Sequence, residues 1–90
     1  MRILFMGTPE FAVPSLKALA AEHELVGVVT QPDRRAGRGQ RLVQSPVKVV
    51  ALELGLPIFQ PERISDPQVM EDLEGLGAEL FVVVAFGQKI

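Results

Sequence analysis

The chain has 90 residues, a formal net charge of −2 at pH 7 and a hydrophobic content of 48%, which provides for at most one small domain. It has no cysteine and a single histidine, which excludes disulfide bonds and thiolate metal sites and argues against a zinc site. No apolar run approaches the roughly 20 residues that span a bilayer, so we expect a soluble cytoplasmic protein that binds no metal and no membrane.

The first apolar run, residues 3–6, is closed by Gly7, a pattern typical of a buried strand followed by a sharp turn. The next residues have the composition of a helix start. Thr8 offers a capping hydroxyl, Pro9 suits the first helical position, and a glutamate follows near the positive end of the helix dipole. We therefore predict a helix that continues over residues 11–21.

A second apolar run, residues 25–29, predicts the next strand. Gly27 within it indicates that another segment approaches closely there. His23 falls in the connection before this strand, between Glu22 and Glu24, at the end of the predicted helix. It is therefore interpreted as a turn residue near a helix end rather than as a ligand or base.

The segment Thr30–Lys48 differs in composition from the apolar segments on either side of it. Residues 31–48 hold five cations against one carboxylate, a local charge of +4, whereas the rest of the chain has −6. Gly37 and Gly39 lie among the arginines and permit sharp turns. This asymmetry favours a polyanionic partner such as phosphate or nucleic acid. Charge alone also fits a solvated surface loop, and we expect residues 31–44 to be irregular and mobile.

The second half of the chain repeats the cap-plus-proline pattern at Ser45-Pro46 and at Asp66-Pro67. Pro57 at the start of a short strand is tolerated best at a sheet edge. The last apolar run is the most hydrophobic and should be flanked on both sides in the sheet. The predicted elements are a helix over 47–54, a strand over 56–59, a helix over 68–74 and a strand over 80–85.

This alternation of strands and helices predicts an α/β fold with an open, mostly parallel, doubly wound sheet whose first strand is central. Ligands of such sheets bind at the carboxyl ends of the strands. The turn at 7–10, the start of the basic segment and the end of the last strand at 86–88 should meet at that edge. A dinucleotide site is not supported, because the first turn has one glycine where three spaced glycines are required.

Three motifs together resemble the methionyl-tRNA formyltransferase family: GTPEFAVPSL after the first strand, QPDRRAGRG followed by SPVK, and VVVAFGQKI at residues 82–90. The resemblance covers all 90 residues and implies a Rossmann-like formyltransferase fold. It implies that residues 1–90 are the N-terminal part of the catalytic domain. The implied activity moves a formyl group from 10-formyltetrahydrofolate to the α-amino group of methionyl initiator tRNA. It also implies a monomeric parent enzyme.

The resemblance further implies roles for individual residues. The position of Arg38 is the principal tRNA contact in the family, and the other implied tRNA-binding residues are Arg34, Arg35, Gly37, Arg41 and Lys48. Phe11 would lie near the methionyl side chain. The residues implied to bind the folate are Phe86, Gly87, Gln88 and Ile90.

The sequence departs from the family pattern at three positions. Arg35 stands where the family usually has proline, Phe86 replaces a frequent tyrosine, and Lys89 replaces an apolar residue. The family's catalytic asparagine, histidine and aspartate all correspond to positions after Ile90. We therefore assign no catalytic residue within the chain and expect it to be inactive by itself.

Two other functions stay open at this point. A related formyltransferase or hydrolase could act on a sugar nucleotide or on free formyltetrahydrofolate, and it would need the folate edge but not the arginine loop. A non-catalytic α/β module could bind RNA through that loop, and it would have no affinity for folate.

Overall fold

The computed structural model describes residues 1–37, 39 and 41–87. Four strands form a parallel sheet in the order β5-β2-β1-β6, and two further strands pair only with each other. The strands are β1 (Arg2–Gly7), β2 (Glu24–Val29), β3 (Arg34–Ala36), β4 (Arg41–Val43), β5 (Ile58–Phe59) and β6 (Leu80–Val84). The helices are the 3₁₀ turn η1 (Glu10–Ala12) and α1 (Val13–Glu22), α2 (Pro46–Glu53) and α3 (Pro67–Glu74).

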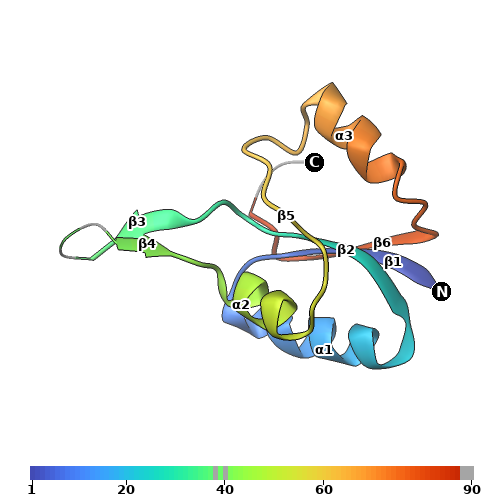
Figure 1. Ribbon diagram of the computed structural model, residues 1–90, viewed down its shortest axis with the longest axis horizontal. Coiled ribbons are helices and arrows are strands. Elements are labelled where there is room, and N and C mark those ends of the chain that lie inside the picture. Colours follow the sequence, from blue (N-terminus) through green and yellow to red (C-terminus); the bar gives the residue numbers. More distant parts are fainter. Residues whose placement is uncertain (38, 40, 88–90) are drawn as a thin grey trace.

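The sheet is covered on both faces, with α1 and α2 on one side and α3 on the other (Figure 1). Alternate side chains of β1 enter opposite cores because successive strand residues point to opposite faces. Ile3 and Phe5 pack with residues of α1 and α2, whereas Leu4 and Met6 pack with residues on the α3 side. The doubly wound α/β fold and its central first strand are thereby confirmed.

Gly27 lies where β2 passes its neighbours closely. A Cβ atom on Gly27 would lie 2.8 Å from Phe59 Cε2, closer than real contacts, and 3.0 Å from Leu4 Cδ1, so these side chains would have to shift. The register between β1 and β2 shifts beside this position, between Ile3 and Leu4. The sequence predicted a close approach at Gly27, and the segments that approach it are the side chains of Phe59 and Leu4 on the neighbouring strands.

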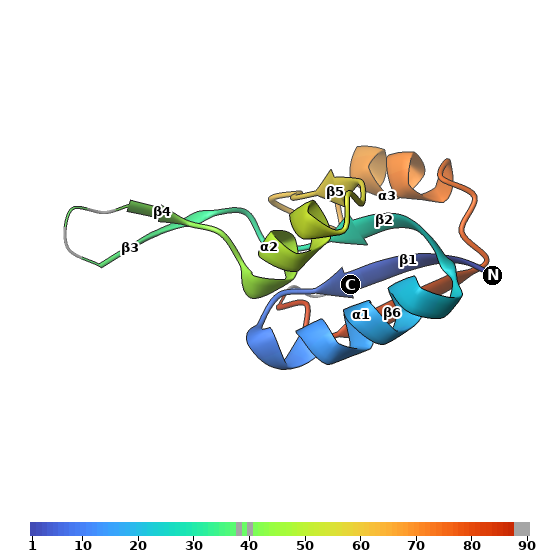
Figure 2. The same cartoon turned by 60° about the horizontal axis from the view of Figure 1, so that its bottom comes forward.

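We predicted irregular structure over residues 31–44, which is correct for 31–33 and 44 but wrong for residues 34–36 and 41–43, which are strands. Strands β3 and β4 form an antiparallel ribbon that projects from the body of the molecule, and we call residues 34–43 the basic ribbon (Figures 1 and 2). Gly37 and Gly39 have φ angles of 73° and 81°, which side chains with a Cβ disfavour. Strand structure forms here because Leu42 and Val43 favour a strand, and the turn between the two strands can use the glycines.

The start of the first helix also differs from the prediction. The 3₁₀ turn η1 comes first, α1 begins only at Val13, and no side chain caps either element. Thr8 does not act as the cap because its hydroxyl bonds to other strand ends. The caps predicted at Ser45 and Asp66 are confirmed, since their side chains accept from the backbone N–H groups of Lys48 and Gln68.

Strand β6 does not have the two neighbours that its composition predicted. Among the described residues it pairs with β1 alone and forms one edge of the sheet. Leu80, Phe81 and Val83 are exposed there. At the opposite edge lies β5, as the proline at its start predicted.

Candidate functional site

The carboxyl ends of the strands are joined by the side chain of Thr8. Its hydroxyl donates to the carbonyl oxygen of Phe86 over 2.7 Å and accepts from the backbone N–H of Gln31 over 3.3 Å. One short side chain thus connects the segments that follow β1, β2 and β6. This arrangement explains why Thr8 cannot cap the first helix.

A second set of contacts fixes the start of α2 to the end of β2. The hydroxyl oxygens of Thr30 and Ser45 are 2.6 Å apart, and Ser45 Oγ also accepts from the backbone N–H of Lys48 over 3.0 Å. Thr30 is fully buried, so its hydroxyl needs this partner. These hydrogen bonds therefore hold the end of β2 against the start of α2. These are the elements that precede and follow the basic ribbon.

Asp33 lies at the base of the basic ribbon and contacts two other elements. Gln60 Nε2, just after β5, donates to Asp33 Oδ1 over 2.7 Å, and Lys48 Nζ, on α2, approaches the two carboxylate oxygens at 3.0 and 2.9 Å. The hydrogen bonds from Gln60 and Lys48 hold the pKa of Asp33 below its usual value of 3.8, although partial burial acts in the opposite direction. Asp33 is therefore ionised and paired at neutral pH.

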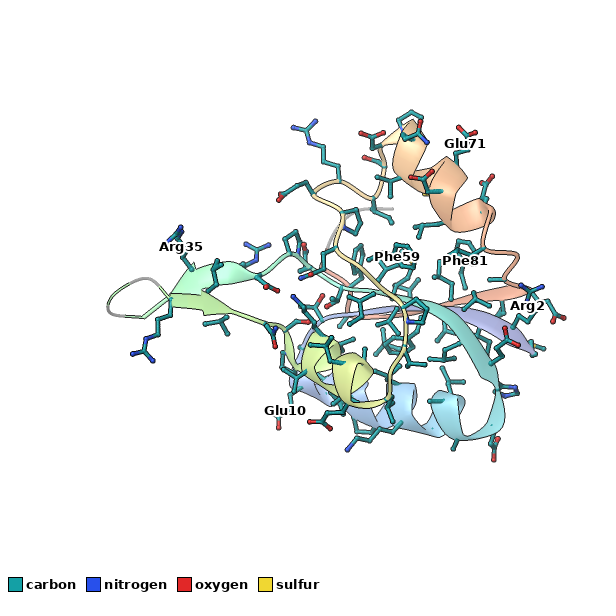
Figure 3. All side chains as sticks on the ribbon, viewed as in Figure 1. Arg2, Glu10, Arg35, Phe59, Glu71 and Phe81 are labelled. Atoms are coloured by element: carbon teal, nitrogen blue, oxygen red, sulfur yellow. The ribbon has the colours of Figure 1, made fainter. Side chains whose placement is uncertain are left out.

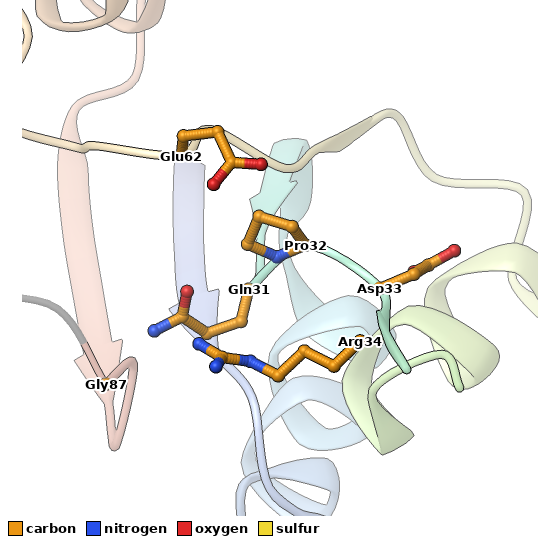
Figure 4. Close-up of a pocket in the computed structure, with 6 residues that line it drawn as sticks. All are labelled: Gln31, Pro32, Asp33, Arg34, Glu62 and Gly87. Atoms are coloured by element: carbon orange, nitrogen blue, oxygen red, sulfur yellow. The ribbon is translucent and has the colours of Figure 1, made fainter. Parts of the chain in front are cut away.

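A polar pocket of about 310 Å³ opens at this edge of the sheet (Figure 4). It is lined by Gln31, Pro32, Asp33, Arg34, Glu62 and Gly87. A second hollow of about 220 Å³ on the other side of the same segment shares Gln31, Pro32 and Arg34 with the first. Arg34 extends toward Gln31 at the pocket, whereas Asp33 points away from it toward α2 (Figure 4).

The predicted tRNA-binding residues fall in two places. Arg34, Arg35 and Arg41 are exposed on the basic ribbon, and Arg35 points away from the body of the molecule (Figure 3). Gly37 and Gly39 are also exposed on the ribbon, and apart from their chain neighbours no described residue lies within 4 Å of a Cβ atom built on either. Lys48 instead lies on α2 in the pair with Asp33. The principal predicted contact, Arg38, lies outside the described residues.

The residues predicted for the methionyl and folate sites have different environments. Phe11 on η1 is 70% exposed, whereas Phe86 is only 2% exposed and belongs to the core on the α3 side. Gly87 lines the polar pocket and has a φ of 94°. A Cβ atom there would lie 2.9 Å from the side-chain nitrogen of Gln31. Gln88 and Ile90 lie outside the described residues.

The polar pocket brings together two groups that the sequence assigned to different ligands, because Arg34 and Gly87 both line it. The sequence placed the turn with Thr8 and the start of the basic segment with Gln31 at this edge of the sheet, but Gln60 was not predicted to join them. A signal existed for Gln60, since it is a polar residue that directly follows the predicted parallel strand over 56–59. His23, which was not assigned a chemical role, ends α1 at the opposite end of β2.

No group of three or more His, Cys, Asp and Glu side chains within residues 1–37, 39 and 41–87 is arranged to hold a metal ion. None of the helices in the described part of the chain is long and apolar enough to cross a membrane.

Known proteins similar to this chain match it along nearly its whole length. The enzyme called methionyl-tRNA formyltransferase from Xanthomonas axonopodis pv. citri is 56% identical over 97% of this chain and 28% of its own length. Proteins of the same name from Symbiobacterium thermophilum and Synechococcus sp. are 61% and 63% identical over 98% of this chain. In both, the match covers 27% of the relative, so the chain spans little more than a quarter of the length of these proteins. A family model described as formyl transferase matches residues 1–90, and the chain therefore belongs to the formyl transferase family.

Proposed function

We propose that this chain is the N-terminal part of an enzyme that transfers the formyl group of 10-formyltetrahydrofolate to the α-amino group of methionyl-tRNA for translation initiation. The observation that carries the proposal is the match to methionyl-tRNA formyltransferases along nearly the whole chain, at 56–63% identity in the three relatives above. The proposal includes a cytoplasmic monomer, initiator tRNA as partner and no metal.

The arrangement of the molecule fits a large anionic substrate beside a small one. The basic ribbon projects from the sheet edge where ligands of doubly wound folds bind, and the polar pocket lies at its base (Figures 1 and 4). The ribbon would contact phosphates of the tRNA while the edge receives the methionyl end and the folate. Phe11 and the segment 86–90 are the proposed residues for these two smaller groups.

In the proposed reaction, the α-amino nitrogen forms a bond to the formyl carbon, and the bond from that carbon to N10 of the folate breaks. The proton that the amine loses is balanced by the proton that N10 gains. Such a reaction needs a base near the amine and a donor for the tetrahedral oxyanion. We assign these roles to residues of the whole enzyme that lie outside this chain.

The test uses a full-length methionyl-tRNA formyltransferase that contains this sequence, assayed with methionyl-tRNA and 10-formyltetrahydrofolate. Arg38→Ala should weaken the use of methionyl-tRNA and spare folate binding. Should the ribbon neutralise two or three phosphates, affinity falls with salt at a log-log slope of roughly −2 to −3, and Arg38→Ala makes that slope shallower by about one unit. Arg63→Ala, an exposed arginine outside the ribbon, is the matched control. An unchanged slope with unchanged kinetics would identify the ribbon as solvated surface.

The two other functions give different results in the same assay. An enzyme for sugar nucleotides would formylate an amino-sugar nucleotide in preference to methionyl-tRNA, and a hydrolase would release formate without an acceptor. A non-catalytic RNA-binding module would bind tRNA with no affinity for the folate even at full length.

A further inference from the structure

The orientation of the basic ribbon is determined at its base. Within residues 1–37, 39 and 41–87, strands β3 and β4 pair only with each other, and no strand pairing joins them to the main sheet. The ribbon connects to the body through residues 31–33 on one side and 44–45 on the other. Whatever fixes these two connections also fixes the direction in which the arginines project.

The contacts of Asp33 tie one connection to two elements of the body. Its carboxylate accepts from Lys48 on α2 and from Gln60 after β5, and Gln60 Nε2 also donates to the carbonyl oxygen of Gln31 over 3.2 Å. The side chains of Lys48 and Asp33 are only 15% and 25% exposed. Charge pairs that are mostly withdrawn from water are geometrically more restrictive than surface pairs, because breaking one leaves a poorly solvated charge.

The ion pair between Lys48 and Asp33 also changes how many cations are available to contact the tRNA. On sequence alone, Lys48 is a fifth cation of the basic segment and Asp33 is an anion that reduces its charge. If this were their only role, neutralising Asp33 would strengthen the attraction of a polyanion. The geometry gives the opposite expectation, because Asp33 bonds to Lys48 at 2.9 Å and to Gln60 at 2.7 Å, and neutralising it would loosen the base of the ribbon.

We propose that Asp33, Lys48 and Gln60 form a clamp that holds the basic ribbon in the orientation in which its arginines meet the tRNA. This inference rests on the proposed function and specifies how that interface is held. The three are positioning residues, and Asp33 promotes the binding of a polyanion although it is itself an anion. A fixed ribbon binds more tightly than a loose one because less conformational entropy is lost on association.

The experiment measures tRNA binding and formylation kinetics in the same full-length enzyme. Asp33→Asn should raise the Kd for methionyl-tRNA by about five- to tenfold, which corresponds to about 1–1.4 kcal/mol. The KM for methionyl-tRNA should rise in parallel, while the KM for the folate and the kcat at saturating tRNA stay within twofold. A general loss of folded protein would lower the amount of active enzyme for both substrates. Glu71→Gln removes an exposed carboxylate on α3 and is the matched control (Figure 3).

Lys48→Met distinguishes a role of Lys48 in the clamp from a direct contact of Lys48 with a phosphate of the tRNA. If Lys48 acts through the clamp, Lys48→Met should weaken tRNA binding and leave the salt slope unchanged. The double variant with Asp33→Asn should then bind tRNA no more weakly than either single variant. A direct contact would make the slope shallower by about 0.7–0.9 and add independently to the effect of Asp33→Asn.

Gln60→Ala provides a third measurement that leaves every charge in place. It should raise the Kd by about two- to threefold and decides the question if Asp33→Asn fails to fold. Tighter or unchanged binding in both Asp33→Asn and Gln60→Ala would overturn the clamp while leaving the proposed function intact. A wild-type enzyme that neither binds nor formylates methionyl-tRNA would overturn both.

Discussion

The carboxyl edge of the sheet and the basic ribbon are adjacent in the chain but differ in how they are held. At the edge, Thr8, Thr30 and Asp33 each bond to a segment distant in sequence, so every strand end is tied to another. On the ribbon, the described arginines are exposed and the strands pair only with each other. The difference supports our proposal that a small polar base, and not packing within the ribbon, orients this extended cationic surface.

The largest effect is expected from separating residues 1–90 from the rest of an enzyme. Strand β6 exposes Leu80, Phe81 and Val83 at an edge of the sheet, an apolar counterpart to the charged ribbon. Unpaired apolar edges associate with other copies. Expressed alone, the chain should show no formyl transfer and should dimerise or aggregate, as followed by light scattering.

A matched variant sharpens this test. Val83→Lys places a charge on the exposed edge and should reduce association without restoring activity. A monodisperse wild-type monomer with measurable turnover would contradict two predictions. One is that the exposed edge of β6 causes association, and the other is that the catalytic groups lie outside this chain.

Glycine substitutions compare the packing of the two regions directly. A Cβ atom on Gly7 would lie 2.8 Å from Phe5 Cε2 and 3.0 Å from the carbonyl oxygen of Val84, so Gly7→Ala should lower the free energy of unfolding by about 2–3 kcal/mol. On the ribbon, a Cβ atom on Gly39 meets no described residue beyond its chain neighbours within 4 Å, so Gly39→Ala should cost about 1 kcal/mol for its φ of 81°. Urea denaturation measures both, and equal losses would contradict the comparison.

Removal of the Thr8 hydroxyl should have a smaller effect. Thr8→Val keeps the shape of the side chain but leaves the Phe86 carbonyl and the Gln31 N–H without this partner. We expect a loss of about 1–2 kcal/mol in the free energy of unfolding. Thr8→Ser retains the hydroxyl and should recover most of it. If the serine variant is as unstable as the valine variant, packing of the methyl group and not the hydroxyl is what holds the strand ends.

The smallest effect concerns pH. Because the pKa of Asp33 is lowered in the folded protein by Gln60 and Lys48, its contribution to stability is complete above the usual value of 3.8 and is lost as the pH falls toward the folded pKa. Asp33→Asn should therefore flatten the loss of stability below pH 3.8. Thermal unfolding across this acidic range checks the prediction, with Glu71→Gln as the control. Parallel curves for wild type and Asp33→Asn would contradict it.

Local sequence patterns predicted the main elements because they depend on neighbouring residues. The apolar runs ending at Gly7 and Val29 became parallel strands, and the caps at Ser45 and Asp66 formed as expected. The narrow passage at Gly27 was also visible from the sequence. In each case the decisive interaction is local or follows from burial of a continuous apolar run.

Tertiary structure decided which partners the polar residues found. Thr8 fits a helix cap by its local sequence, yet its hydroxyl bonds to Phe86, 78 residues away. Lys48 belongs to the basic segment by position, yet its charge is paired with Asp33. A local pattern shows that a polar group needs a partner but not which distant segment supplies it. The sequence by itself therefore determined the sheet, the helices and the cationic character of residues 31–48. Only the packing of strand ends against one another decided which of those charges face outward and which hold the ribbon in place.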